Sequence, residues 1–238
     1  MRLIVKYHPE INIKSRSVRR RFSKLLESNT RSIIKRIFES AHVISRWSDL
    51  LIETTELPRD TELEIIDALL RIPGVDQFNE VIEYPFVDFD TAFKDVARHW
   101  QDELEGKSFC VRVKRSGKHD FTSSELERYI GGGLNQAVES AKVSLRNPDI
   151  TVKAELRGDR FQVVKKHYRG LGGMPIPSQE DVLSLISGGF DSGVATYHLM
   201  RRGARTHFCF FNLGGKEHEI GVKQVSYEIW KRYSSTQN

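Results

Sequence analysis

Apolar residues recur at helical spacing in one early segment of the chain and alternate with polar residues in the segments beside it. In order, the pattern predicts a strand over 2–8, a helix over 17–38, a hairpin over 41–55 turning at Ser48-Asp49, a helix over 60–72 with Asp60 as its N-cap, and a strand over 75–86. This order is typical of a ferredoxin-like α+β unit, and Pro85 marks its predicted end.

A second α+β unit and a third segment of different character follow. The pattern predicts a helix over 88–104, a strand over 107–115, a helix over 123–140 opened by a capping box of Ser124 and Glu127, and a hairpin over 149–167 turning at Gly158-Asp159. Residues 168–180 are rich in Gly and Pro and form the predicted linker.

Beyond the linker, strands and helices alternate. The pattern predicts a strand over 182–186, a helix from about Gly193 to Arg202, a strand over 206–213 and a last helix from about His218. Such alternation is typical of the start of an α/β doubly wound parallel sheet. We therefore expect domains at 1–84, 85–170 and 171–238.

The bulk composition limits the class of protein. No apolar stretch is long enough for a membrane helix, and the first residues carry too much charge for a signal peptide. Cys110 and Cys209 lie in strand-like apolar runs, which favours buried free thiols over a disulfide. These features predict a cytoplasmic protein.

The net charge of +5 is unevenly distributed along the chain. Residues 1–36 hold eleven Lys/Arg against two Asp/Glu, which gives +9, and residues 106–170 hold fourteen against seven, which gives +7. The intervening residues 37–105 hold five against seventeen, which gives −12. Two basic blocks around an acidic one favour contact with a polyanion such as nucleic acid.

The stretch "LISGGFDSGV" places two glycines, two serines and an aspartate between a buried strand and a helix. Gly188 and Gly189 free the backbone N–H groups to form an anion-binding nest at the positive end of the helix, and Ser187 and Ser192 add hydroxyl groups. A carboxylate at Asp191 would repel phosphate unless a cation lies between them, so Asp191 indicates Mg²⁺. The Walker, dinucleotide-binding and nucleophile-elbow motifs are absent from the chain.

"SGGFDS" resembles the signature of the PP-loop ATP pyrophosphatases, which cleave ATP between its α and β phosphates. The resemblance implies ATP as cofactor, pyrophosphate bound by Ser187 to Ser192, and Asp191 managing metal and charge at the catalytic centre. It also implies that Leu185 and Ile186 pack on the nucleotide and that Phe210 and Phe211 lie beside the adenosine.

The stretch "FCVRVKRSGKHDFTSSELERYIGGGLNQ" resembles the THUMP domain, an RNA-binding module of tRNA-modifying enzymes. The candidate tRNA contacts are Arg112, Lys114, Arg115, Lys118 and His119 in this block and Lys14, Arg19 and Arg20 in the first one. With "HPEINIKS" and "EDVLSLISGGFDSGV", the domain order resembles the bacterial tRNA 4-thiouridine synthetases over essentially the whole chain.

That resemblance implies adenylation of a tRNA uridine at O4 and then sulfur transfer from a protein persulfide. It implies a cysteine desulfurase as sulfur donor and a role in supplying sulfur to the thiazole of thiamine, where a thiamine sulfur carrier protein is a further partner. Whether the protein forms a homodimer and which tRNAs it prefers stay open.

The family's PP-loop domain runs on beyond the motif, and its sulfur-bearing cysteines match neither Cys110 nor Cys209. We therefore expect a truncated or split product that retains tRNA and ATP binding, cannot complete sulfur transfer alone, and exposes a sheet edge and an apolar face. Two alternatives stay open: a tRNA-binding module with a vestigial nucleotide site, and another PP-loop transferase, such as an amidating ligase or a cytidine-modifying enzyme.

Overall fold

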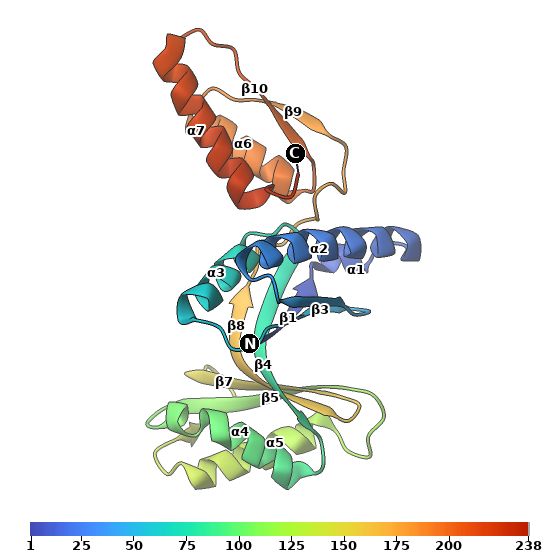
Figure 1. Cartoon of the computed structure of the whole chain (residues 1–238). Helices are drawn as coiled ribbons and strands as arrows, with labels where there is room; N and C mark the ends of the chain where they lie inside the picture. Colours follow the sequence, from blue (N-terminus) through green and yellow to red (C-terminus); the bar gives the residue numbers. More distant parts are fainter. Residues whose placement is uncertain (238) are drawn as a thin grey trace. The chain divides into compact units, whose positions relative to one another are not determined.

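The computed structural model describes residues 1–237 and divides into two compact units (Figure 1). The split unit contains Met1–Phe78 together with the chain from Tyr168 onward, and the central unit contains Asn79–His167. The borders fall inside strands β4 (Val75–Pro85) and β8 (Arg160–Arg169), so each of these strands contributes residues to both units.

The first part of the split unit has the predicted ferredoxin-like order. Its elements are β1 (Arg2–Tyr7), α1 (Pro9–Asn12), α2 (Arg16–Ile37), β2 (His42–Ser45), β3 (Asp49–Glu53), α3 (Arg59–Leu70) and the start of β4. Strands β1 and β2 both pair antiparallel with β3, in the order β2-β3-β1-β4. The predicted hairpin is confirmed, but its turn lies at Trp47-Ser48, one residue before the predicted Ser48-Asp49, because Asp49 already belongs to β3 and accepts from the Arg46 N–H.

The N-cap predicted for α3 is wrong. Pro58, with φ −57° and ψ 146°, is the N-cap, so Asp60 lies inside the first turn. A carboxylate there still stabilises the helix because it faces the positive end of the helix dipole.

Helices α2 and α3 cover one face of this sheet (Figure 1). Leu26 and Ile34 of α2, Ile65 of α3 and Leu3 and Val5 of β1 are fully buried in a common core. The apolar positions of α2 thus face the sheet, and most of its polar positions lie on the outer surface, with Asn29 and Thr30 as buried exceptions.

The central unit packs two helices on a mixed sheet. Its elements are α4 (Phe89–Trp100), the short helix η1 (Asp102–Leu104), β5 (Ser108–Ser116), α5 (Ser123–Ala137), β6 (Lys142–Val143), β7 (Ile150–Arg157) and β8. Strand β5 runs parallel to β6 and β7, and β7 pairs antiparallel with β8 across Gly158-Asp159, as predicted. Apolar side chains of β5 and β7 meet those of α5 in one buried core.

The capping box of α5 lies two residues before the predicted one. The Thr122 hydroxyl accepts from the Glu125 N–H at 3.2 Å, and the Glu125 carboxylate accepts from the Thr122 N–H at 2.6 Å. That bond lowers the pKa of Glu125. Glu127 instead accepts a 2.8 Å bond from the Val113 N–H, so its carboxylate joins the helix to β5.

The last part of the split unit consists of β9 (Val182–Leu185), α6 (Phe190–Arg201), β10 (Thr206–Cys209) and α7 (Gly215–Tyr233). The two strands are parallel, with Ser184 opposite Phe208, and both helices lie on one side of them (Figure 1). Helix α6 begins three residues before the predicted Gly193, and β10 ends at Cys209 because the chain turns away before Leu213.

The opposite face of the β9–β10 sheet is open among the described residues. Leu183 and Leu185 point away from the helices and are 66% and 62% exposed, whereas Ser184 between them is buried and bonds Thr196 of α6. This is the exposed apolar face expected from the sequence. Cys110 is buried, Cys209 is half-buried, and both are free thiols. None of the described helices combines the length and apolar character that crossing a bilayer requires.

Three consecutive glycines inside α5 generate a stability prediction with its own control. A Cβ on Gly133 would lie 2.6 Å from the Phe93 ring of α4, whereas a Cβ on Gly132 would meet nothing within 4 Å. We expect Gly133→Ala to be less stable than Gly132→Ala by about 1–3 kcal/mol because of overpacking, and Gly132→Ala to gain up to about 1 kcal/mol of helix propensity.

Urea unfolding of the two variants and the parent chain measures both differences. Equal stabilities for the two variants would contradict the close packing of α4 against α5.

Candidate functional site

The SGGFDS turn connects the carboxyl end of β9 to the first residue of α6. Gly188 adopts φ +82°, a left-handed conformation that favours glycine, and a Cβ there would approach a Val222 methyl group of α7 to 3.0 Å. Gly189, with φ −79°, is the N-cap of α6. The chain therefore bends sharply enough for the helix to begin directly at the motif.

The N-terminus of α6 offers backbone donors that no side chain covers in the described chain. Glycine at the N-cap has no oxygen to accept from the first-turn N–H groups, and the structure shows no side-chain cap there. The Ser192 hydroxyl instead closes the loop from within, since it accepts from the Ser187 N–H at 3.3 Å and donates to the Gly189 carbonyl at 3.0 Å. The free donors are thus main-chain groups rather than the two serine hydroxyls.

His218 of α7 holds the turn from the other side and was missed from the sequence. Its Nε2 donates to the Ser187 carbonyl at 2.8 Å, and its ring meets Phe210 edge-on at 5.0 Å between centroids. The side chain lies 31 positions beyond Ser187 in the chain, at the start of a second helix. Gly214 and Gly215 at the start of α7 are the signal in the sequence that could have pointed to this element.

The other predicted nucleotide-site residues divide into exposed and buried ones. Phe190 and Asp191 in the first turn of α6 are exposed, Phe190 to 94%. Ile186 is buried and its N–H donates to the Cys209 carbonyl, so its side chain belongs to the core. Leu185 faces the open side of the sheet, Phe210 is half-buried against His218, and Phe211 is exposed.

The geometry suits a phosphate group. An uncapped helix N-terminus beside a left-handed glycine presents convergent N–H donors, and the helix dipole adds positive potential at the same place. The described residues contain no cluster of three or more His, Cys, Asp or Glu side chains. A metal at Asp191 would therefore need oxygens from the phosphates and from water, and Mg²⁺ accepts such a mixed set.

The predicted tRNA contacts of the central unit fall into two groups. Lys114 and Lys118 are exposed, and the described residues offer them no ion pair. Arg115 is tied into the structure because its Nη1 donates to His119 Nδ1 at 3.2 Å, while His119 Nε2 donates to the Gly158 carbonyl at 2.8 Å. Arg112 lies 3.9 Å from Glu127. The lysines can bind phosphate, and the Arg115–His119 pair positions the turn beside them.

The predicted contacts of the split unit come together. Lys14, Arg19 and Arg20 line one groove beside the start of α2. That groove also contains Arg46 and Trp47 from the β2–β3 turn, which sequence patterns did not single out.

Comparison with known families matches three segments that together cover most of the chain. Residues 2–79 match the ThiI ferredoxin-like domain, residues 87–164 match the THUMP domain, and residues 177–238 match the thiamine biosynthesis protein ThiI. The chain belongs to the ThiI family. The resemblance inferred from "SGGFDS" and from the THUMP-like block is thus confirmed.

Curated relatives of the ThiI family agree over nearly the whole chain. The tRNA sulfurtransferases of Shigella dysenteriae and Escherichia coli K12 are each 54% identical over 236 residues, which is 99% of this chain and 48% of the relative. The chain therefore spans about half the length of the curated relatives it matches.

Solved structures show the same fold at low identity. A protein from Pyrococcus horikoshii aligns with a TM-score of 0.81 at 20% identity, over 98% of this chain and 75% of its own. A 4-thiouridine synthetase, solved as a complex with RNA and ATP, aligns with a TM-score of 0.79 at 22% identity, over all of this chain and 60% of its own. These structures share the fold of this chain over nearly its whole length.

The left-handed Gly188 generates a testable prediction for the turn. Gly188→Ala forces a side chain into φ +82° and against Val222, which we expect to cost about 1–2 kcal/mol for the backbone alone. Gly189→Ala is the matched control because its φ is ordinary and its Cβ would meet only Ser187 Oγ at 3.6 Å. Hydrogen exchange of the Ile186–Ser192 amides should accelerate in the first variant and not in the second; identical exchange would refute the geometry of the turn.

Proposed function

We propose that this chain binds tRNA and ATP for ATP-dependent 4-thiolation of a tRNA uridine. The observation that supports the nucleotide site most directly is the uncapped N-terminus of α6 behind the left-handed Gly188, because it presents main-chain donors to a phosphate group. The family assignment and the exposed cations of the THUMP unit support the RNA substrate.

In this proposal the chain's own residues orient the nucleotide. The N–H groups between Gly188 and Ser192 would hold the phosphates that leave as pyrophosphate, and Asp191 would help to hold a Mg²⁺ ion that offsets their charge. When bound there, ATP would supply AMP to the uridine O4 with release of pyrophosphate, which would turn a poor leaving group into a good one. Phe210 and Phe211 would lie beside the adenosine, and the backbone of Leu185 and Ile186 would line the approach.

The remaining steps and partners of this proposal come from the family resemblance. A cysteine desulfurase would supply sulfur as a persulfide, and the same sulfur would reach the thiazole of thiamine, with a thiamine sulfur carrier protein as a further partner. The proposed location is the cytoplasm, where tRNA is found and where free thiols such as Cys110 and Cys209 persist. The proposed domains are residues 1–84, 85–170 and 171–238.

A second candidate is an RNA-binding module whose nucleotide site is vestigial. One observation favours it: in the described chain, Ser192 uses its hydroxyl to close the loop itself, so the serines of the motif offer less to a ligand than the sequence alone indicates. Nucleotide affinity separates the two functions.

Asp191 provides the test of the nucleotide site. Asp191→Ala should weaken Mg-ATP binding at least about tenfold, which equals about 1.4 kcal/mol, while ATP binding in EDTA should change little. The control is Asp181→Asn, an exposed aspartate beside Arg205 and His207 next to the other end of β9. Calorimetric titration with and without Mg²⁺ measures both, and an unchanged Mg-ATP affinity in Asp191→Ala would favour the vestigial site.

The two exposed lysines of the central unit provide the test of RNA binding. The double variant Lys114→Ala, Lys118→Ala should bind tRNA more weakly, and its plot of log K against log salt should be shallower by about 2, one unit for each phosphate that the variant no longer binds. Lys94→Ala is the control, because Lys94 pairs with Asp90 on the surface of α4. Filter binding over a salt series gives the slopes; a slope equal to the parent's would remove these lysines from the interface.

A further inference from the structure

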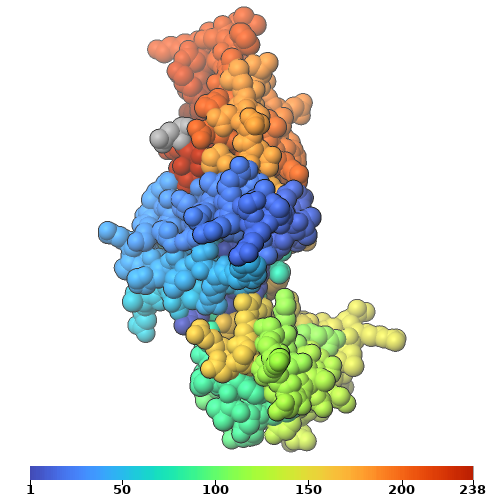
Figure 2. Space-filling model, turned by 90° about the vertical axis from the view of Figure 1, so that its right-hand side faces the viewer, coloured from blue at the N-terminus to red at the C-terminus, as the bar shows by residue number. Residues whose placement is uncertain are grey.

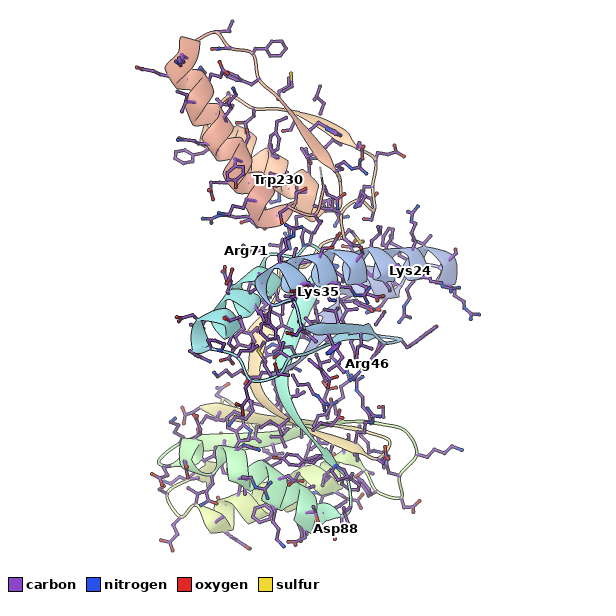
Figure 3. All side chains as sticks on the ribbon, in the orientation of Figure 1. Lys24, Lys35, Arg46, Arg71, Asp88 and Trp230 are labelled. Atoms are coloured by element: carbon purple, nitrogen blue, oxygen red, sulfur yellow. The ribbon has the colours of Figure 1, made fainter. Side chains whose placement is uncertain are left out.

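A groove of about 670 Å³ lies between the first turns of α2 and the β2–β3 turn of the split unit. Figure 3 labels Lys24 on the helix and Arg46 on the turn, and Figure 2 shows the blue N-terminal residues that form this face. The groove is lined by six cations: Lys14, Arg16, Arg19, Arg20, Lys24 and Arg46. Ser23, Glu27, Ser45 and Trp47 complete it.

The charge of the groove is not balanced by the described residues around it. Glu27 is the acidic residue of its lining, and that carboxylate pairs with Arg31 at 2.5 Å. The first turn of α2 carries no acidic residue, and Lys14 and Arg16 flank its N-terminus. Cations at the positive end of a helix dipole reduce stability, so this arrangement indicates a site for an anion rather than a structural device.

Trp47 adds a flat apolar surface to this positive groove. The side chain is 75% exposed although the Arg19 guanidinium lies over its ring at 4.8 Å from the centroid and donates to the Trp47 carbonyl at 2.8 Å. Arginine therefore covers one face of the indole, and the exposed area that remains leaves the other face open. A partner that covered this large apolar ring would gain free energy by removing its surface from water.

The turn that carries Trp47 is held in place before any ligand binds. Tyr7, buried under the hairpin, donates to the Asp49 carbonyl at 3.2 Å, and burial raises the pKa of its hydroxyl. The Arg46 N–H donates to the same carbonyl at 2.8 Å. Because the turn is already ordered, little conformational entropy is lost when a ligand stacks on Trp47.

We propose that this groove binds an unpaired nucleotide of an RNA strand, with its base stacked on the open face of Trp47 and its flanking phosphates paired with the groove cations. The proposal rests on the proposed function. It specifies that the split unit contacts an unpaired part of the RNA. Stacking on an aromatic side chain needs a base that is free of its duplex neighbours. Six cations along one groove suit several phosphates in a row better than the phosphate of a free mononucleotide.

The test compares Trp47→Leu with Trp47→Phe and with Tyr227→Leu, an exposed aromatic residue of α7 outside the groove. The probe is a fluorescein-labelled single-stranded RNA of six nucleotides, followed by anisotropy on the full chain. We expect Trp47→Leu to lose affinity about tenfold, Trp47→Phe to keep most of it, and Tyr227→Leu to match the parent. The same RNA in a duplex should be insensitive to all three changes.

Arg16→Glu gives a second readout that a folding defect cannot produce. This variant places an acidic residue in the first turn of α2, so its thermal unfolding midpoint should equal or exceed that of the parent while its affinity for the single-stranded RNA falls. A lower midpoint together with unchanged affinity would overturn the role assigned to the groove charges.

The remaining outcomes separate this proposal from the proposed function. Equal affinity of Trp47→Leu and Tyr227→Leu for the single strand overturns the stacking site, even if the Lys114 and Lys118 variant still loses tRNA binding. If AMP displaced the labelled RNA as effectively as unlabelled RNA did, the groove would be a site for a free nucleotide, and the proposal of an RNA strand would be overturned. If the Lys114 and Lys118 variant and the groove variants all bound tRNA as tightly as the parent, the result would count against the RNA substrate itself.

Discussion

Backbone donors that no side chain of the described residues caps lie at the N-termini of α2 and α6, and both proposed sites depend on them. At α6 the N-cap is Gly189, which has no side chain to fill the first-turn donors. At α2 the Ser15 hydroxyl makes no capping bond and cations surround the helix start. Water can satisfy such donors in the free protein, so leaving them open costs little, and an incoming phosphate replaces that water with charge-assisted bonds.

The same chain closes other helix ends with its own carboxylates. Asp88 caps α4 by accepting from the Thr91 N–H at 2.7 Å, and Glu125 completes the capping box of α5. These hydrogen bonds lower the pKa of both acids. The open ends therefore reflect local residue choice rather than a property of helices in general. Gly189 is the N-cap of α6 where α4 has Asp88, and Val18 is the third residue of α2 where α5 has Glu125.

Periodicity was sufficient for the order of the longer helices and strands, although it missed the short elements α1 and β6 and did not separate η1 from α4, and the motif was sufficient for the family. The local geometry of the sites needed the structure. The helix predicted from Gly193 starts at Phe190, because a glycine N-cap leaves no polar side chain as a sign in the sequence. The capping box is at Thr122 rather than Ser124, although both positions begin an S/T-x-x-E pattern in the sequence. The structure uses Thr122 and Glu125 because Glu127 accepts a bond from β5 instead. His218 and Trp47 were missed because their roles come from contacts between elements distant in sequence.

Arginines and lysines have different roles in the two basic regions. Arg115 lies 5.8 Å from the centre of the Phe121 ring and bonds His119, and Arg19 lies over Trp47 and bonds its carbonyl. A planar guanidinium held on a ring loses little further freedom, so these arginines fix the aromatic surfaces. Lys114 and Lys118 beside one pair, and Lys14 and Lys24 beside the other, have no ion pair among the described residues and remain available for phosphate. Salt dependence of RNA binding should therefore follow the lysines, whereas discrimination between base-paired and unpaired nucleotides should follow the arginine-bound aromatic rings.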